Sequence, residues 1–144
     1  MKRREYLDLQ KKHQQEIEDF PIAYAFSDEQ LKAALEKLGV EKSECVTVFG
    51  HGDIVKKEDA PKLVAMLKRH TKEVHEALKD PEFAEAAFLY EMDNHEYAIN
   101  WSGDEDVLAC FALSWDDICK MGLQLVWNTA RNKHMKNAEE WGVI

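Results

Sequence analysis

Cysteine is scarce in this sequence, and the few cysteines lie far apart. Cys45, Cys110 and Cys119 form no CxxC pair, and an odd count fits neither a disulfide framework nor a four-thiolate zinc site. We therefore expect free thiols and a reducing, cytoplasmic location. All three have apolar neighbours, which predicts buried thiols that pack as small hydrophobic side chains and do not act as nucleophiles.

Long apolar runs are also missing. Residues 1–20 are charged throughout and lack the apolar core of a secretory signal, and no later run approaches the roughly 18 residues that cross a bilayer. We therefore expect no membrane association. The sequence also shows no linker, repeat or low-complexity segment. The chain has 144 residues, of which 45% are apolar, and this length and composition predict a single globular domain over 1–144.

Lysine and arginine are absent from residues 81–117, in a chain whose net charge is −9. This segment contains ten acidic residues: Glu82, Glu85, Glu91, Asp93, Glu96, Asp104, Glu105, Asp106, Asp116 and Asp117. Such a segment repels phosphate backbones and attracts cationic partners. We therefore expect no direct nucleic-acid binding through this segment. The alternatives are a binding surface for a cationic protein or an ordinary solvated face.

Helical patterns dominate what is present. They predict a polar N-terminal helix over about 2–19, helices over 28–38, 59–79 and from 81 onward, a brief helix over 105–113, and a C-terminal helical segment over about 115–140 that Gly122 interrupts. Ser27 and Ser114 are the clearest N-cap signals, each followed three residues later by Gln30 or Asp117. Gly39 suits the C-terminal cap of the second helix.

Strand signals are few and short. Residues 45–49 are rich in β-branched and aromatic side chains and precede the Gly50–Asp53 turn, which leads to Ile54 and Val55. Residues 22–26 form a strand or a buried connector, and residues 97–101 form a further short strand candidate. The sequence therefore predicts a helix-dominated α+β domain with a small sheet or hairpin.

Two patterns indicate a candidate site for a divalent metal. Glu91 and His95 lie four residues apart, so that they share one face if the helix persists, and His51 lies between two glycines in a tight turn. The structural alternatives are that His95 caps its helix while Glu91 faces water, and that Gly50 and Gly52 simply permit the turn. A metal would need at least one more ligand to converge with these residues.

The tryptophans divide into two pairs. Trp101 and Trp115 flank acidic segments and are expected in the core, whereas Trp127 and Trp141 lie in the polar C-terminal segment and are expected to mark a contact surface. No GxSxG, HExxH, P-loop, GxGxxG or EF-hand pattern is present.

Three segments are the basis for comparing this sequence with a known family: AYAFSDEQLKAALEKLG, VFGHGDIVKK, and FAEAAFLYEMDNHEY followed by an acidic turn. Over about residues 20–113 they resemble an uncharacterised family of small soluble proteins from gut bacteria and their mobile elements. The GHGD turn is less glycine-rich than the turn of that family. The resemblance implies an accessory gene of a phage or plasmid and brings no activity with it.

The leading hypothesis is a non-enzymatic binding protein that uses the acidic segment, with Glu82, Glu85, Glu91, Asp93, Glu96, Asp104, Glu105 and Asp106 as its surface. Such a protein would inhibit a nucleic-acid-binding host protein, for example a CRISPR nuclease, without needing a cofactor. The alternative is a metal-binding protein or metal-dependent hydrolase that uses His51, Glu91 and His95. A homodimer joined through the terminal helices is a third possibility.

Overall fold

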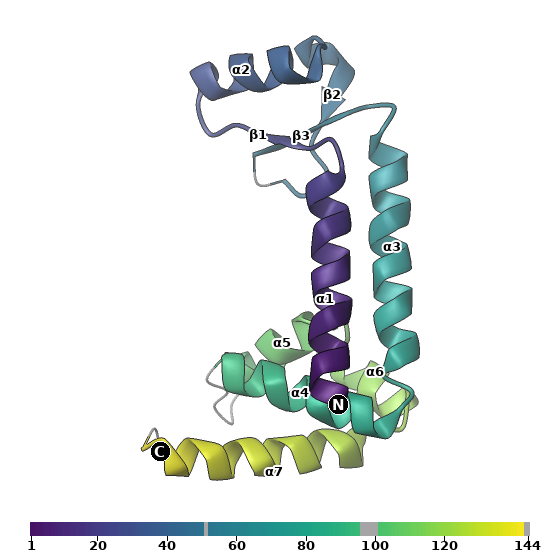
Figure 1. Ribbon diagram of the computed structural model, residues 1–144, viewed down its shortest axis with the longest axis vertical. Helices are drawn as coiled ribbons and strands as arrows, with labels where there is room; N and C mark the ends of the chain where they lie inside the picture. Colours follow the sequence, from purple (N-terminus) through teal and green to yellow (C-terminus); the bar gives the residue numbers. More distant parts are fainter. Residues whose placement is uncertain (51, 96–100, 143–144) are drawn as a thin grey trace. The chain divides into compact units, whose positions relative to one another are not determined.

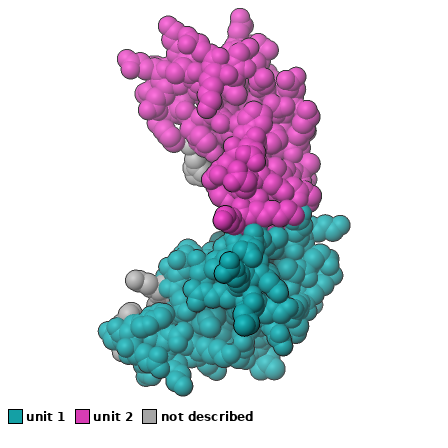
Figure 2. Space-filling model, viewed as in Figure 1, with its two compact units in different colours: residues 1–10, 71–144 teal, residues 11–70 magenta. Residues whose placement is uncertain are grey.

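The computed structural model describes residues 1–50, 52–95 and 101–142, except for the side chains of residues 101 and 102. The prediction of a helix-dominated α+β fold with a small sheet is confirmed. The chain packs as two compact units, one formed by residues 1–10 and 71–144 and the other by residues 11–70 (Figure 2). Figure 1 shows two long helices, α1 (Lys2–Asp19) and α3 (Ala60–Ala77). By their residue ranges, each contributes residues to both units. Their continuous helical patterns explain why no linker in the sequence marks the border.

The unit formed by residues 11–70 contains the sheet. Besides parts of α1 and α3 it holds β1 (Ala23–Tyr24), α2 (Asp28–Leu38), the 3₁₀ helix η1 (Lys42–Glu44), β2 (Cys45–Val46) and β3 (Asp53–Lys56). The three strands are antiparallel in the order β1-β3-β2, with Ala23 opposite Ile54 and Val46 opposite Val55. A small core forms where Ala23 and Ile54 meet Ala34 and its apolar neighbours on α2.

The strand predicted over 45–49 ends after two residues. The buried Asp53 carboxylate accepts hydrogen bonds from the backbone N–H groups of Val48 and Phe49, at 2.7 and 3.1 Å, and from the Thr47 hydroxyl at 2.7 Å. These bonds satisfy donors that a longer strand would direct to a neighbour, so that the chain leaves the ladder at Thr47.

The predicted bounds of α2 are confirmed. The Ser27 hydroxyl accepts a hydrogen bond from Gln30 N, and Gly39 closes the helix with φ +69°. The Gln30 side chain accepts from Phe26 N, one residue before the position that a capping box would use.

In the other unit, the elements that the structure describes are helices packed around one core. It contains the first ten residues, α4 (Pro81–Asn94), α5 (Trp101–Ala109), α6 (Trp115–Lys120) and α7 (Gln124–Glu140). Helices α4 and α7 lie side by side in Figure 1, and the Phe88 and Trp127 rings meet edge to face with centroids 5.1 Å apart. Tyr6 of α1 is buried in the same core, where its ring contacts Phe83 and Phe111.

Several boundaries in this unit differ from the prediction. Helix α5 begins at Trp101 and ends at Ala109, whereas 105–113 was expected, and the strand expected over 97–101 lies outside the described residues except for Trp101, which is helical. The Ser114–Asp117 capping box and the interruption at Gly122, with φ +69°, are confirmed.

Two expectations about burial are wrong. Cys110 and Cys119 are exposed and Cys45 is half-buried, because Cys110 follows the last turn of α5 and Cys119 lies on the outer face of the short α6. Trp115 is 45% exposed whereas Trp127 is 1% exposed, the reverse of the predicted arrangement. Trp127 shares one face of α7 with the buried Ala130 and His134, which turns it into the core.

Candidate metal site of helices α4 and α5

Glu91 is a buried carboxylate on a helix face that is otherwise apolar. It lies in the last turns of α4, three and four positions after Phe88 and Ala87, so that the helical repeat directs all three side chains to the core. Glu91 is 3% exposed. Because a charged group this deeply buried costs free energy unless it is paired, hydrogen-bonded or bound to a metal, its partners decide what the site can do.

Two of these partners come from α1 and bind one carboxylate oxygen. The Tyr6 hydroxyl donates to Glu91 Oε1 at 3.0 Å, and Gln10 Nε2 donates to the same oxygen at 3.1 Å. Gln10 Nε2 also lies 2.7 Å from the Tyr6 hydroxyl oxygen. These contacts fix the orientation of the carboxylate through Oε1, so that its second oxygen, Oε2, is available to other partners.

The second oxygen faces an imidazole and a thiol. His95, the C-cap residue of α4, places Nε2 3.2 Å from Glu91 Oε2, which confirms that the two residues share a face. Cys110, the residue after α5, places Sγ 3.3 Å from the same His95 Nε2. The three potential ligand atoms of Glu91, His95 and Cys110 all lie within 4.8 Å of one another.

The arrangement differs from a catalytic cysteine triad. In a triad the acid binds one imidazole nitrogen and the nucleophile binds the other, so that the ring carries a proton between them. Here the carboxylate and the thiol face the same nitrogen. Since one ring nitrogen holds at most one proton, the convergence on a single point is typical of ligands around a cation.

The surroundings of the Cys110 thiol keep it protonated when no cation is bound. Although the residue as a whole is exposed, partial desolvation of its thiol raises the pKa of Cys110 to about 12, with further contributions from the hydrogen bond and the negative charge of Glu91. Burial, and then the neighbouring Glu91, also raise the pKa of Tyr6. Without a cation, Cys110 is therefore a protonated and unreactive thiol at neutral pH. A bound divalent ion favours the thiolate, because a coordinating thiol loses its proton.

The donor set indicates which metal suits the residues. A thiolate, an imidazole and a carboxylate are all common zinc ligands, with bonds of about 2.3 Å to sulfur and about 2.0–2.2 Å to nitrogen and oxygen. Tetrahedral angles at such bond lengths separate the ligand atoms by about 3.3–3.7 Å. The separations of 3.2 and 3.3 Å around His95 Nε2 are already close to this value.

The sequence-predicted metal ligands are only partly brought together. Glu91 and His95 meet, whereas His51 lies outside the described residues. The ligand that sequence analysis missed is Cys110. The sequence predicts a buried thiol at Cys110, and no motif joins this residue to His95, fifteen residues earlier.

The residues predicted to form an acidic binding surface have different environments. Glu82, Glu105 and Asp106 are exposed, Asp104 is half-buried, and Glu96 lies outside the described residues. Glu85 pairs with Lys133 at 2.9 Å and Asp93 pairs with the buried His134 at 2.6 Å, so that both bind α7. Glu91 is in the core and presents no charge to a partner surface.

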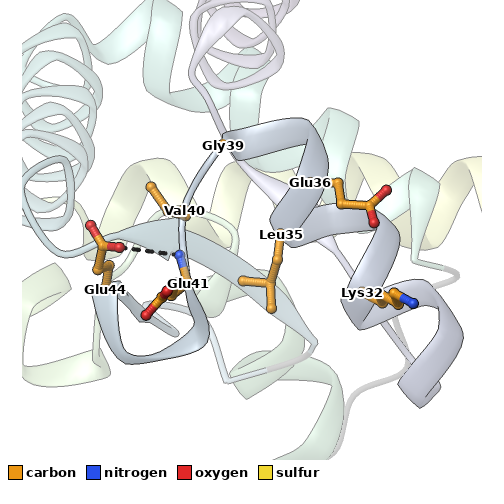
Figure 3. Close-up of a pocket in the computed structure, with 7 residues that line it drawn as sticks. All are labelled: Lys32, Leu35, Glu36, Gly39, Val40, Glu41 and Glu44. Carbon is orange, nitrogen blue, oxygen red and sulfur yellow. Dashed lines mark hydrogen bonds between the residues drawn. The ribbon is translucent and has the colours of Figure 1, made fainter.

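A hollow at the C-terminal end of α2 lies in the unit formed by residues 11–70. Figure 3 shows Leu35 directed toward the η1 segment and three carboxylates around the rim, from Glu36, Glu41 and Glu44. Glu41 and Glu44 form a reciprocal capping box that holds η1 in place. The carboxylates of Glu41 and Glu44 therefore have a structural role.

The family model that matches this chain covers residues 5–133, which include every residue of the candidate metal site. The chain belongs to DUF7659, a family of unknown function. The expectation of an uncharacterised family is confirmed at that level, and the DUF7659 match extends beyond the 20–113 segment at both ends. No curated protein and no solved structure was found to match the chain. Within the described residues, no helix has the length and apolar character that a membrane span requires.

Proposed function

We propose that this DUF7659 chain is a zinc-binding protein whose protein ligands are Glu91, His95 and Cys110. The observation that carries the proposal is the convergence of a carboxylate oxygen and a thiol sulfur on one imidazole nitrogen, at 3.2 and 3.3 Å. A zinc ion accepts all three groups at once, which a single proton cannot do.

Three protein ligands leave one position of a tetrahedral ion open. The His95 side chain is 41% exposed and Cys110 is exposed, so that solvent reaches the ligands from one side. A water molecule or an external donor atom would complete the coordination, as in zinc sites with three protein ligands. The alternative of a metal-dependent hydrolase rests on this open position and remains a prediction.

The experiment compares two exposed cysteines in untagged, reduced protein. After metal removal and reconstitution with one equivalent of zinc, the wild type should retain close to one ion per chain through gel filtration. Cys110→Ser should retain little, whereas Cys119→Ser, which alters an exposed thiol on α6, should match the wild type. Replacing zinc with cobalt should give a thiolate charge-transfer absorption in the wild type and in Cys119→Ser.

Two outcomes would reject the zinc site. One is a wild type that retains no metal, and the other is a Cys110→Ser variant that binds zinc as tightly as the wild type. Circular dichroism of each variant separates a lost ligand from a lost fold.

Binding of a cationic protein surface is the second candidate function. It is supported by the exposed carboxylates of Glu82, Glu105 and Asp106 in a segment without Lys or Arg. More specific versions of this prediction are that the chain inhibits a host protein such as a CRISPR nuclease and that it originates in a mobile element. The DUF7659 match gives neither a host nor a partner.

A further inference from the structure

A cavity of about 790 Å³ opens between α5, the start of α6 and α7, separate from the metal ligands. Its size lies within the range of about 300–1,000 Å³ that is typical of small-ligand sites. Its lining combines apolar and charged side chains, among them Leu108, Leu113, Trp115, Asp104, Glu105 and Arg131.

The apolar part of the cavity is a preformed aromatic wall. Trp115 is 45% exposed, yet its ring packs edge to face on the buried Trp127 with centroids 6.0 Å apart. Leu108 and Leu113 are buried beside it at 5% and 8% exposure. A large apolar group would bury the exposed indole face without any rearrangement of the core.

The charged groups lie on different helices of the same cavity. Asp104 and Glu105 belong to α5, whereas Arg131 and Asn128 belong to α7. A guanidinium binds a carboxylate through two parallel hydrogen bonds, and carboxylates bind an ammonium group. The cavity therefore complements a ligand that carries one charge of each sign around an apolar body.

We propose that this cavity binds a short zwitterionic peptide of two or three residues with a large apolar side chain. Its terminal carboxylate pairs with Arg131, its ammonium group lies near Asp104 and Glu105, and its side chain packs on Trp115. The volume of the cavity favours a di- or tripeptide over a single amino acid.

The test is calorimetric titration of metal-free protein with phenylalanyl-leucine, its carboxyl-amidated form and its N-acetylated form. The free dipeptide should bind in a saturable manner, and amidation or acetylation should each weaken binding. Arg131→Gln should weaken binding of the free dipeptide about tenfold to hundredfold and leave binding of the amidated form unchanged. Arg4→Gln, which removes an exposed arginine of α1 outside the cavity, should bind like the wild type.

A second variant keeps the test independent of Arg131. Trp115→Ala should weaken all three peptides, because it removes the aromatic wall that they share. The proposal fails if no peptide binds up to the millimolar range, or if Arg131→Gln weakens the free and the amidated dipeptide equally. Amide chemical shifts that change on peptide addition should map to α5 and α7, and changes confined to other helices would also overturn the assignment.

Discussion

The hydroxyl of Tyr6 donates a hydrogen bond to Glu91 Oε1 at 3.0 Å, which joins the first turns of α1 to the end of α4 across 85 positions in the sequence. Tyr6 is 1% exposed and Glu91 is 3% exposed. The bond therefore stabilises a carboxylate in the core and holds its other oxygen toward His95 and Cys110. Tyr6 is accordingly a positioning residue for the proposed zinc site.

Removing this hydroxyl should weaken both the fold and the metal site. We expect Tyr6→Phe to lower the free energy of unfolding by about 1–3 kcal/mol, because the buried carboxylate loses a donor. Zinc affinity should fall about tenfold to hundredfold, as is typical when the partner of a ligand is removed. Urea unfolding and competition with a chromogenic chelator measure the two effects. The control is Tyr24→Phe, at a side chain that is 53% exposed, and unchanged zinc affinity in Tyr6→Phe would contradict the positioning role.

The pair formed by Asp93 and His134 should contribute to stability rather than to metal binding. His134 is 2% exposed and its Nδ1 lies 2.6 Å from Asp93 Oδ1, which links α4 to α7. Asp93→Ala should therefore cost about 1–3 kcal/mol in urea unfolding, because it removes a hydrogen-bond partner of a buried imidazole. Asp116→Asn disrupts an exposed pair with Lys120 and should cost less than about 0.5 kcal/mol. Equal losses of unfolding free energy in the two variants would show that the Asp93–His134 pair stabilises the fold no more than an exposed ion pair does.

Acid stability should depend on Glu16. Hydrogen bonds from His70 and then from Arg69 lower the pKa of Glu16 from 4.5 to about 2. Because the pKa is depressed in the folded state, the contribution of Glu16 is present above pH 4.5 and is lost as the pH falls toward 2. Glu16→Gln should thus flatten the decline in unfolding free energy across this window, whereas Glu18→Gln, an exposed residue on the same helix, should follow the wild type. A Glu16→Gln profile that parallels the wild type would refute this assignment.

Gly50 and Gly52 should tolerate alanine differently. Gly50 and Gly52 have φ values of +78° and +82°, so that either substitution strains the backbone by about 1–2 kcal/mol. A Cβ at Gly52 would also lie 2.9 Å from the carbonyl oxygen of Ala25 and 2.7 Å from the Phe26 ring, whereas one at Gly50 meets nothing within 4 Å. Gly52→Ala should therefore destabilise the protein more than Gly50→Ala in thermal unfolding. The reverse order would be incompatible with the close approach of Ala25 and Phe26 to Gly52.

The acidic segment makes a separate prediction about partners. If exposed carboxylates bind a cationic protein, Glu105→Lys and Asp106→Lys should reduce capture of that protein from a host lysate at low salt. Capture by the wild type should also fall as salt is raised, because exposed charges are screened. Charge reversal at Asp116, which already pairs with Lys120, is the matched control. A partner retained equally at low and raised salt would argue against an electrostatic interaction.

The helices were predictable because their signals are local. Ser27, Gly39 and the Ser114–Asp117 pair each determine a helix end through bonds to residues three or four positions away, and the structure shows these bonds. The predicted strand over 45–49 is longer than β2, because the end of β2 depends on the carboxylate of Asp53. Residue composition alone does not show that this carboxylate accepts hydrogen bonds from Val48 and Phe49.

Only the local part of the metal site could be predicted from the sequence. Glu91 and His95 are joined by the helical repeat, which sequence spacing shows directly. The approach of Cys110, and the Tyr6 hydrogen bond to Glu91, depend on the packing of α1, α4 and α5. That packing is non-local, and no spacing rule indicates it.

X-ray absorption at the zinc edge distinguishes a zinc ion bound by the Cys110 thiolate from one bound by nitrogen and oxygen ligands alone. In the reconstituted wild type it should show one sulfur at about 2.3 Å with nitrogen and oxygen ligands at about 2.0–2.2 Å. The sulfur shell should disappear in Cys110→Ser and persist in Cys119→Ser. A wild-type spectrum with nitrogen and oxygen ligands alone, or a sulfur shell that survives in Cys110→Ser, would contradict a zinc site formed by Glu91, His95 and Cys110.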